Sequence, residues 1–250
     1  MTPTITMKDF SEISEVPDIA TLMRAAKWLE GKTLVQITKE IKRSDALSRV
    51  TTKGDVGYVI ENGYFKIKKN SEAKPDVEHL GVEIKTCPLK YNKERNRLSV
   101  KEPLSLNIVN YFDEVKNKDI TESSLYHKNK RILFVFYVHD LKKKRSDYEI
   151  KYVFLWGMDN NVLDELRPDY KIIIDKIRVG EATDLHQKYN QYLTTCPKHC
   201  GDFKDPNCKI SKTKQPFSTE LAERRAFRLK VKYMNMIVSK YLNRPLVKGG

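Results

Sequence analysis

Cysteine is scarce in this chain, and long apolar runs are missing. Only 4 of the 250 residues are cysteine, too few to make a disulfide framework plausible for a chain of this size. The longest apolar runs, such as RILFVFYV at residues 131–138, are too short to span a bilayer, and the first ten residues lack the apolar stretch of a signal peptide. We therefore expect a soluble, cytoplasmic protein with no membrane partner.

Acidic residues are in short supply relative to basic ones. Lysine and arginine number 47 against 33 aspartates and glutamates, which gives a formal net charge of +14. This excess suits a polyanionic partner such as nucleic acid, whose condensed counterions are released on binding. Because the lysines are dispersed and no arginine-rich tail is present, charge alone leaves an ordinary solvated surface as an equal alternative.

Three of the four cysteines lie close together in the sequence. Cys196, Cys200 and Cys208 flank His199 in CPKHCGDFKDPNC, whereas Cys87 stands alone. Three thiolates and an imidazole could supply the four tetrahedral ligands of zinc, but the paired C-x2-C knuckles of a strong zinc signal are absent. Reduced thiols in an irregular loop are the favoured interpretation, and a structural zinc site is the alternative.

Hydrophobic spacing predicts a mixed α/β chain. The expected helices cover residues 14–43 with a break at Gly31, 53–65, 164–180 with Pro168 near its start or at a kink, and 184–193. The expected strands cover residues 80–87, 103–112, 130–140 and 148–158, with a further strand and helix in 223–242. We read one domain over 1–250, with an N-terminal helical part at about 1–50, an active-site core at 51–140 and a C-terminal lobe carrying DNA-recognition elements at 141–250.

A carboxylate and lysine cluster stands out in KPDVEHLGVEIKTC, residues 74–87. Asp76 precedes Glu83 by seven residues, and Glu83 and Lys85 point the same way if the segment is a strand. Mg²⁺ needs only one or two protein carboxylates, and a nearby lysine can orient an attacking water or neutralise a phosphorane. The pattern of Pro-Asp, spacer and Glu-x-Lys therefore indicates a phosphodiesterase site, although Glu-x-Lys also occurs as a plain ion pair.

The surrounding sequence, KGDVGYVIENGYF…KPDVEHLGVEIKTCPL, resembles the MutH mismatch-repair nicking endonucleases and the Sau-type, GATC-cutting type II restriction endonucleases. The resemblance implies a restriction-endonuclease-like mixed β-sheet core flanked by helices, with two lobes around a DNA-binding cleft. It also implies that Asp76, Glu83 and the backbone carbonyl of Ile84 hold one Mg²⁺, and that Glu61 ligates a second ion or a metal-bound water. Lys85 would orient the nucleophile.

Three later segments match the same family in order. HKNKRILF carries a second active-site lysine, Lys128, which would contact the scissile phosphate; its alternative interpretation is a solvated loop lysine. NQYLTTCPKHC carries a DNA-contacting lysine, Lys198, and RRAFRLKVKYMNMIVSKYL resembles the C-terminal strand and helix. Arg225 and Arg228 are further candidates for base or phosphate contacts, or else exposed strand residues.

The expected function is that of a type II restriction enzyme that cuts double-stranded DNA at GATC with Mg²⁺ and no small-molecule cofactor. Arg228 stands where MutH has a methylation-sensing tyrosine, which favours the restriction branch. Two-strand cleavage predicts a dimer at least on DNA, and the chain is either a compact enzyme or the N-terminal catalytic domain of a longer one. The alternatives are a MutH-like nickase and a catalytically silent DNA-binding module.

Overall fold

The computed structural model describes residues 5–42, 55–68, 74–92, 97–199 and 210–243. These residues divide into two compact units, of which the first lies within 1–102, 131–157 and 235–250 and the second within 103–130 and 158–234. The units are interleaved along the chain. The expected single domain with parts at 1–50, 51–140 and 141–250 stays a prediction. Among the described residues, no helix combines the length and the apolar character needed to cross a membrane.

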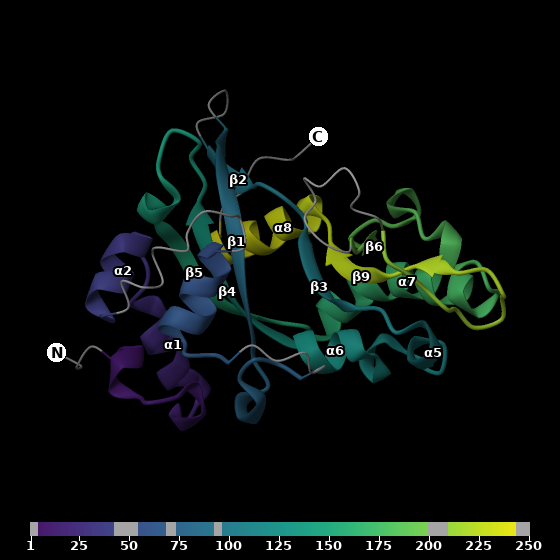
Figure 1. Cartoon of the computed structure of the whole chain (residues 1–250), viewed down its shortest axis with the longest axis horizontal. Coiled ribbons are helices and arrows are strands. Elements are labelled where there is room, and N and C mark those ends of the chain that lie inside the picture. The colour runs from purple at the N-terminus through teal and green to yellow at the C-terminus, as the bar shows by residue number, and fades with distance from the viewer. Residues whose placement is uncertain (1–4, 43–54, 69–73, 93–96, 200–209, 244–250) are drawn as a thin grey trace. The chain divides into compact units, whose positions relative to one another are not determined.

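The first unit is built on a four-stranded mixed sheet, in the order β2-β1-β4-β5 (Figure 1). β1 (Glu83–Asn92) pairs parallel with β4 (Arg131–Val138), whereas β2 (Arg97–Val100) and β5 (Ile150–Gly157) pair antiparallel with β1 and β4. The apolar run of β4 lies in the interior of this sheet, which explains why it lacks polar alternation. The expected mixed α/β class is confirmed.

The first unit also contains helical elements, and apolar residues of its helices share one buried core with those of the sheet. The helical elements are the 3-10 turns Met7–Asp9, Ile13–Glu15, Glu78–Leu80 (η4) and Arg145–Asp147, the helices α1 (Ile19–Lys27), α2 (Leu34–Glu40) and α4 (Asp55–Tyr58), and the π-helical turn η3 (Val59–Tyr64). Gly31, with a φ of +76°, separates α1 from α2 as predicted. Val56, Val59 and Ile60 are buried in the core, also as predicted.

The second unit contains a three-stranded antiparallel sheet in the order β3-β9-β6. Its strands are β3 (Leu104–Ile108), β6 (Leu193–Pro197) and β9 (Arg225–Leu229), and β7 (Lys212–Thr213) pairs with β8 (Ala222–Glu223) beside them. The helical elements are α5 (Tyr111–Glu114), α6 (Ser124–Asn129), α7 (Asn160–Arg178) and the 3-10 turns Ile120–Glu122, Ala182–Asp184 and Gln187–Tyr189. α8 (Val231–Leu242) follows β9, as predicted, and from Asn235 on it belongs to the first unit.

Two sequence-based assignments are wrong. Residues 184–193, expected to be helical, form two 3-10 turns and lead into β6, because the buried carboxylate of Asp169 accepts hydrogen bonds from the N–H groups of residues 191, 192 and 193. Residues 89–103, expected to be a turn-rich connection, contain the end of β1 and all of β2. Pro168 lies inside α7, which begins at Asn160, four residues before the expected start, with Asp159 as its N-cap.

Candidate active site

A tight turn places Asp76 beside the start of β1. Val77 and Val82 pair across this turn through backbone hydrogen bonds of 2.8 and 3.2 Å. Gly81 closes the turn with a φ of +62°, a left-handed conformation that glycine adopts without strain. Asp76 and Glu83 are neighbours for this reason, although seven residues separate them in the sequence.

The two carboxylates are oriented by backbone N–H groups. The N–H of Asp76 donates to Glu83 Oε2 at 3.1 Å, and the N–H of Ile84 donates to Asp76 Oδ2 at 2.9 Å. The side chain of Glu83 is only 2% exposed. The backbone at Asp76 therefore fixes the carboxylate of Glu83, and the backbone next to Glu83 fixes the carboxylate of Asp76. Such mutual positioning is what a preorganised site requires.

Lys85 completes the cluster on the same strand. Its Nζ lies 2.6 Å from Glu83 Oε1, and its side chain is 22% exposed. Burial alone would lower the pKa of Lys85, but the negative charges of Glu83, Asp76 and Glu61 outweigh burial and raise it. Lys85 is therefore a cationic ammonium group, and all three carboxylates are close enough to act on it electrostatically.

Glu61 reaches the cluster from a π-helical turn, a rare element that occurs often at functional sites. A Cβ atom on Gly57 would lie 3.5 Å from Glu61 Oε1 and 3.3 Å from the hydroxyl oxygen of Thr86. Gly57 thus lets both the Glu61 carboxylate and the Thr86 hydroxyl lie close to the backbone of α4. The sequence reading missed both Gly57 and Thr86, although the four-residue spacing of Gly57 and Glu61 on a helix was a signal for the first.

The donor set fits a divalent metal held mainly by two carboxylates. Within the described residues, no three aspartate, glutamate, histidine or cysteine side chains gather closely enough to hold a metal together. Asp76 and Glu83 are joined by their hydrogen bonds, and Mg²⁺ commonly takes one or two protein carboxylates and completes its octahedron with water. Three carboxylates around one ammonium group also leave a net negative charge that a divalent cation would offset.

Lys128 belongs to the second unit, in α6, four residues before Ile132, which pairs in register with Glu83. Its side chain is half-buried rather than fully solvated. It lies in a helix rather than a loop, and both its contact with a scissile phosphate and the alternative of a solvated lysine stay predictions.

Two of the recognition candidates, Arg225 and Arg228, lie on β9, and the third, Lys198, follows the neighbouring strand β6. Lys198 directly follows β6, is partly exposed, and its N–H donates to the carbonyl of Arg224 at 2.7 Å. Arg225 is 7% exposed; its Nε donates to Thr195 Oγ1 at 2.8 Å and its guanidinium pairs with Glu223. In this structure Arg225 is therefore occupied inside its own unit.

Arg228 lies on the opposite face of β9 from Arg225, because the two are three positions apart on a strand and side chains alternate between its faces. It is paired in register with Ser105 on β3 and Thr194 on β6. Its Nε is buried and has no hydrogen-bond acceptor in the part of the chain that the structure describes. Of the two arginines, Arg228 is the one whose Nε lacks a partner among the described residues.

The cysteine cluster can be followed only in part. Cys196 is buried on β6, with its sulfur 3.8 Å from Ser105 Oγ. His199 is exposed, and its backbone forms an isolated antiparallel β-bridge with Ile210. Cys200 and Cys208 lie outside the described residues. The zinc alternative therefore stays untested.

Comparison with known proteins adds a family match. Residues 65–169 match the family model described as DNA mismatch repair enzyme MutH. This range contains Asp76, Glu83, Lys85 and Lys128, whereas Glu61 and the recognition candidates lie outside it.

Individual relatives cover more of the chain. The type II restriction enzyme Sau3AI of Staphylococcus aureus is 34% identical over 221 residues, which are 87% of this chain and 42% of that enzyme. DNA mismatch repair protein MutH of Actinobacillus pleuropneumoniae is 25% identical over 179 residues, 71% of this chain and 75% of the relative. MutH of Shewanella woodyi is 25% identical over 225 residues, with 89% and 91% covered. The chain thus spans less than half the length of Sau3AI.

Proposed function

The chain belongs to the family of MutH and the Sau-type restriction endonucleases, and from this membership we propose that it is a site-specific, Mg²⁺-dependent DNA endonuclease of the type II restriction class. The observation that carries the proposal is the cluster of Asp76, Glu83 and Lys85 at the start of β1. It brings two fixed carboxylates and one ammonium group together, a set suited to metal-assisted phosphodiester hydrolysis.

Asp76, Glu83 and the backbone carbonyl of Ile84 would hold Mg²⁺, and Glu61 would ligate a second ion or a bound water. When bound, the ion would stabilise the charge that develops on the phosphate and make water more acidic. The ammonium group of Lys85, which donates a hydrogen bond to Glu83 at 2.6 Å, would orient the attacking water. Lys128 would stabilise the negative charge of the scissile phosphate in the transition state.

We further propose that the target is GATC in double-stranded DNA, as the resemblance to the Sau-type enzymes implies. Arg228 and Lys198 would contact bases or phosphates in the major groove. The buried Nε of Arg228 supports this role, because it has no acceptor among the described residues. Arg225 would act indirectly by holding β6 and β8 in place through Thr195 and Glu223.

Cleavage of both strands of a palindrome needs two active sites related by a two-fold axis. A chain with one cluster of this kind would therefore act as a dimer at least on DNA, or together with further residues of a longer protein. The length relation to Sau3AI, of which this chain spans 42%, is compatible with either arrangement.

A MutH-like nickase is the second candidate. It is favoured by the MutH family match and by MutH relatives that this chain covers over most of their length. The higher identity to Sau3AI and the presence of Arg228 favour the restriction branch. A silent DNA-binding module is less compatible with the clustered carboxylates, because burying the carboxylate of Glu83 beside that of Asp76 is costly without a use.

The test is incubation of unmethylated plasmid DNA with the protein and Mg²⁺, followed by sequencing of the ends. The controls are EDTA, Lys85→Ala, and Lys151→Ala, which removes an exposed strand lysine with the same spacing from its glutamate partner, Glu149. Fragments ending at GATC that need Mg²⁺ and Lys85 support the proposal. Nicks alone support the MutH-like alternative, and intact DNA contradicts both.

A further inference from the structure

The short helix α6, which carries Lys128, depends on outside contacts for its stability. It has six residues, and helices of this length are unstable in water without tertiary support. Ser123 caps its N-terminus by accepting a hydrogen bond from the N–H of Tyr126 at 3.1 Å. One cap cannot fix such a helix to within a fraction of an ångström, so its remaining contacts decide where Lys128 lies.

Glu114 anchors the first residue of α6, Ser124, through hydrogen bonds. It is fully buried, and its Oε1 accepts hydrogen bonds from the N–H and the hydroxyl of Ser124. Its Oε2 accepts from Tyr170 at 2.8 Å and from Asn117 at 3.1 Å. Its partners in the part of the chain that the structure describes are hydrogen-bond donors and include no ion pair, so these bonds alone offset the cost of burying the charge.

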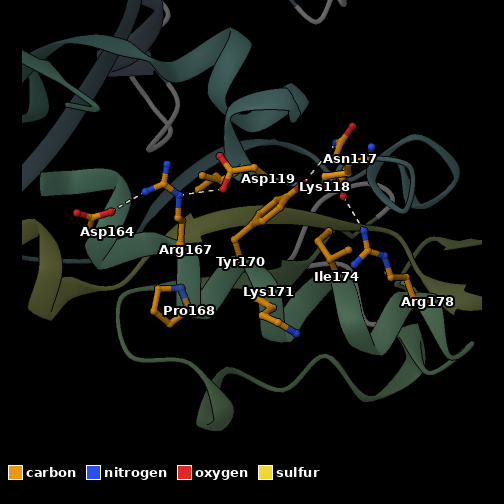
Figure 2. Close-up of a pocket in the computed structure, with 11 residues that line it drawn as sticks. Asn117, Lys118, Asp119, Asp164, Arg167, Pro168, Tyr170, Lys171, Ile174 and Arg178 are labelled. Atoms are coloured by element: carbon orange, nitrogen blue, oxygen red, sulfur yellow. Dashed lines mark hydrogen bonds and ion pairs between the residues drawn. The ribbon is translucent and has the colours of Figure 1, made fainter. Parts of the chain in front are cut away.

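Tyr170 and Asn117 extend this network to the surface of α7. Figure 2 shows their side chains meeting beside a pocket of about 500 Å³, and the Tyr170 hydroxyl also accepts from Asn117 Nδ2 at 3.3 Å. Burial and then the negative charge of Glu114 raise the pKa of Tyr170, which keeps its hydroxyl protonated and able to donate. The carboxylate of Glu114 is therefore anchored to the long helix of the second unit.

The last residue of α6 is held by a second set of hydrogen bonds. Asn129, fully buried, donates from Nδ2 to Asn107 Oδ1 at 3.0 Å and to the carbonyl of Leu125 at 2.9 Å. Asn107, on β3, donates in turn to Ser124 Oγ at 2.8 Å. The two sets therefore join at Ser124, and one connected network fixes α6 at both ends.

We infer that this buried network, Tyr170, Asn117, Glu114, Ser124, Asn107 and Asn129, positions Lys128 for the reaction; the inference rests on the proposed function. Stability alone does not require it, because well-packed apolar residues often replace buried polar groups at no loss. Asn129 even keeps a buried Oδ1 without a donor among the described residues. A displacement of about 1 Å in a charge-stabilising group can cost on the order of 10²-fold in rate, which gives such a network its use.

The test is a double-mutant cycle between Asn107→Ala and Lys128→Ala, with single-turnover cleavage of a duplex containing the target as the readout. Asn107 is half-buried, and its loss leaves the cap and the Glu114 bonds in place. We expect Asn107→Ala to slow cleavage about 10-fold or more with its melting temperature nearly unchanged. In the Lys128→Ala background the same substitution should have no further effect. If Asn107 acts only by positioning the ammonium group of Lys128, its loss cannot slow a variant that lacks this group.

A second variant and a control separate positioning from folding. Glu114→Gln keeps the side chain's shape but replaces one accepting oxygen with a donor, so it should also slow cleavage and also be silent when Lys128 is absent. Asn161→Ala, which removes an exposed asparagine of α7, should leave the rate unchanged.

Independent, multiplying effects of Asn107→Ala and Lys128→Ala would overturn the inference, as would a wild-type rate in both Asn107→Ala and Glu114→Gln. A wild-type chain that fails to cut DNA would instead overturn the proposed function, and the inference with it. The two failures are therefore distinguishable.

Discussion

Asp76 and Glu83 orient each other through the backbone: Glu83 accepts a hydrogen bond from the N–H of Asp76 at 3.1 Å, and Asp76 accepts one from the residue after Glu83 at 2.9 Å. The relationship depends on the tight turn closed by Gly81. Both carboxylates are therefore fixed before any metal or DNA arrives, so substitutions at either one should affect chemistry more than DNA binding.

Glu83→Gln should abolish cleavage, with a loss of about 100-fold or more, while DNA binding persists. The amide keeps the shape of the buried side chain but removes the negative charge that a metal needs. Single-turnover cleavage and a gel-shift titration in EDTA would measure the two properties. Glu149→Gln, on a partly exposed glutamate just before β5 that also pairs with a lysine, is the matched control. Undiminished cleavage by Glu83→Gln would remove Glu83 from the metal site.

Lys85→Ala should make the stability of the folded protein more dependent on Mg²⁺. Without its ammonium group, the buried Glu83 loses a partner at 2.6 Å, which should cost about 2 kcal/mol of the free energy of unfolding. A metal that binds only the folded state restores stability in proportion to its concentration.

Thermal melts with increasing Mg²⁺ should therefore show a larger rise in melting temperature for Lys85→Ala than for the wild type. Glu83→Gln should show little rise. An equal response of Glu83→Gln and the wild type would contradict metal binding at this cluster.

Gly57→Ala should separate stability from activity. Alanine favours helix over glycine by about 1 kcal/mol, so the melting temperature should hold or rise. The new methyl group would lie 3.3 Å from Thr86 Oγ1, which must give way by a few tenths of an ångström, and in van der Waals contact, at 3.5 Å, with Glu61 Oε1. We expect several-fold slower cleavage with unchanged DNA affinity. Wild-type cleavage together with a stable fold would show that the approach of Glu61 to Gly57 has no role.

The sequence was sufficient to predict features that depend on local spacing. Glu83 and Lys85 share a face because they are two positions apart on a strand, and the apolar spacing of Val56, Val59 and Ile60 predicted their burial. The approach of Gly57 to Thr86 joins a helix to a strand about thirty residues later. Local patterns carry no information on such a contact.

Tertiary contacts also overrode local patterns in residues 184–193. Their composition suits a helix, yet Asp169 takes up three consecutive N–H groups and directs the chain into β6. Strand alternation could have separated Arg225 from Arg228, since they are three residues apart. Which of the two faces is buried, however, depends on how the second unit packs around β9. The sequence of β9 alone does not determine this.

The two arginines of β9 should therefore respond oppositely to alanine. Arg225→Ala should cost about 2 kcal/mol of the free energy of unfolding, because it removes a hydrogen bond to Thr195 and the ion-pair partner of Glu223. Arg228→Ala should leave the melting temperature nearly unchanged but weaken binding to the target about 10-fold or more and relax the digestion pattern, since an arginine that contacts a base contributes about 1–3 kcal/mol of discrimination.

Lys198→Ala, next to β6, should likewise weaken or relax recognition without unfolding. Thermal melts, filter binding to target and scrambled duplexes, and plasmid digests would measure all three variants. A stable Arg225→Ala that loses target binding, beside an Arg228→Ala that cuts as the wild type does, would reverse the assignment. The base-reading face of β9 would then be the one that the structure shows bonded to Thr195 and Glu223, and DNA binding would have to break those bonds first.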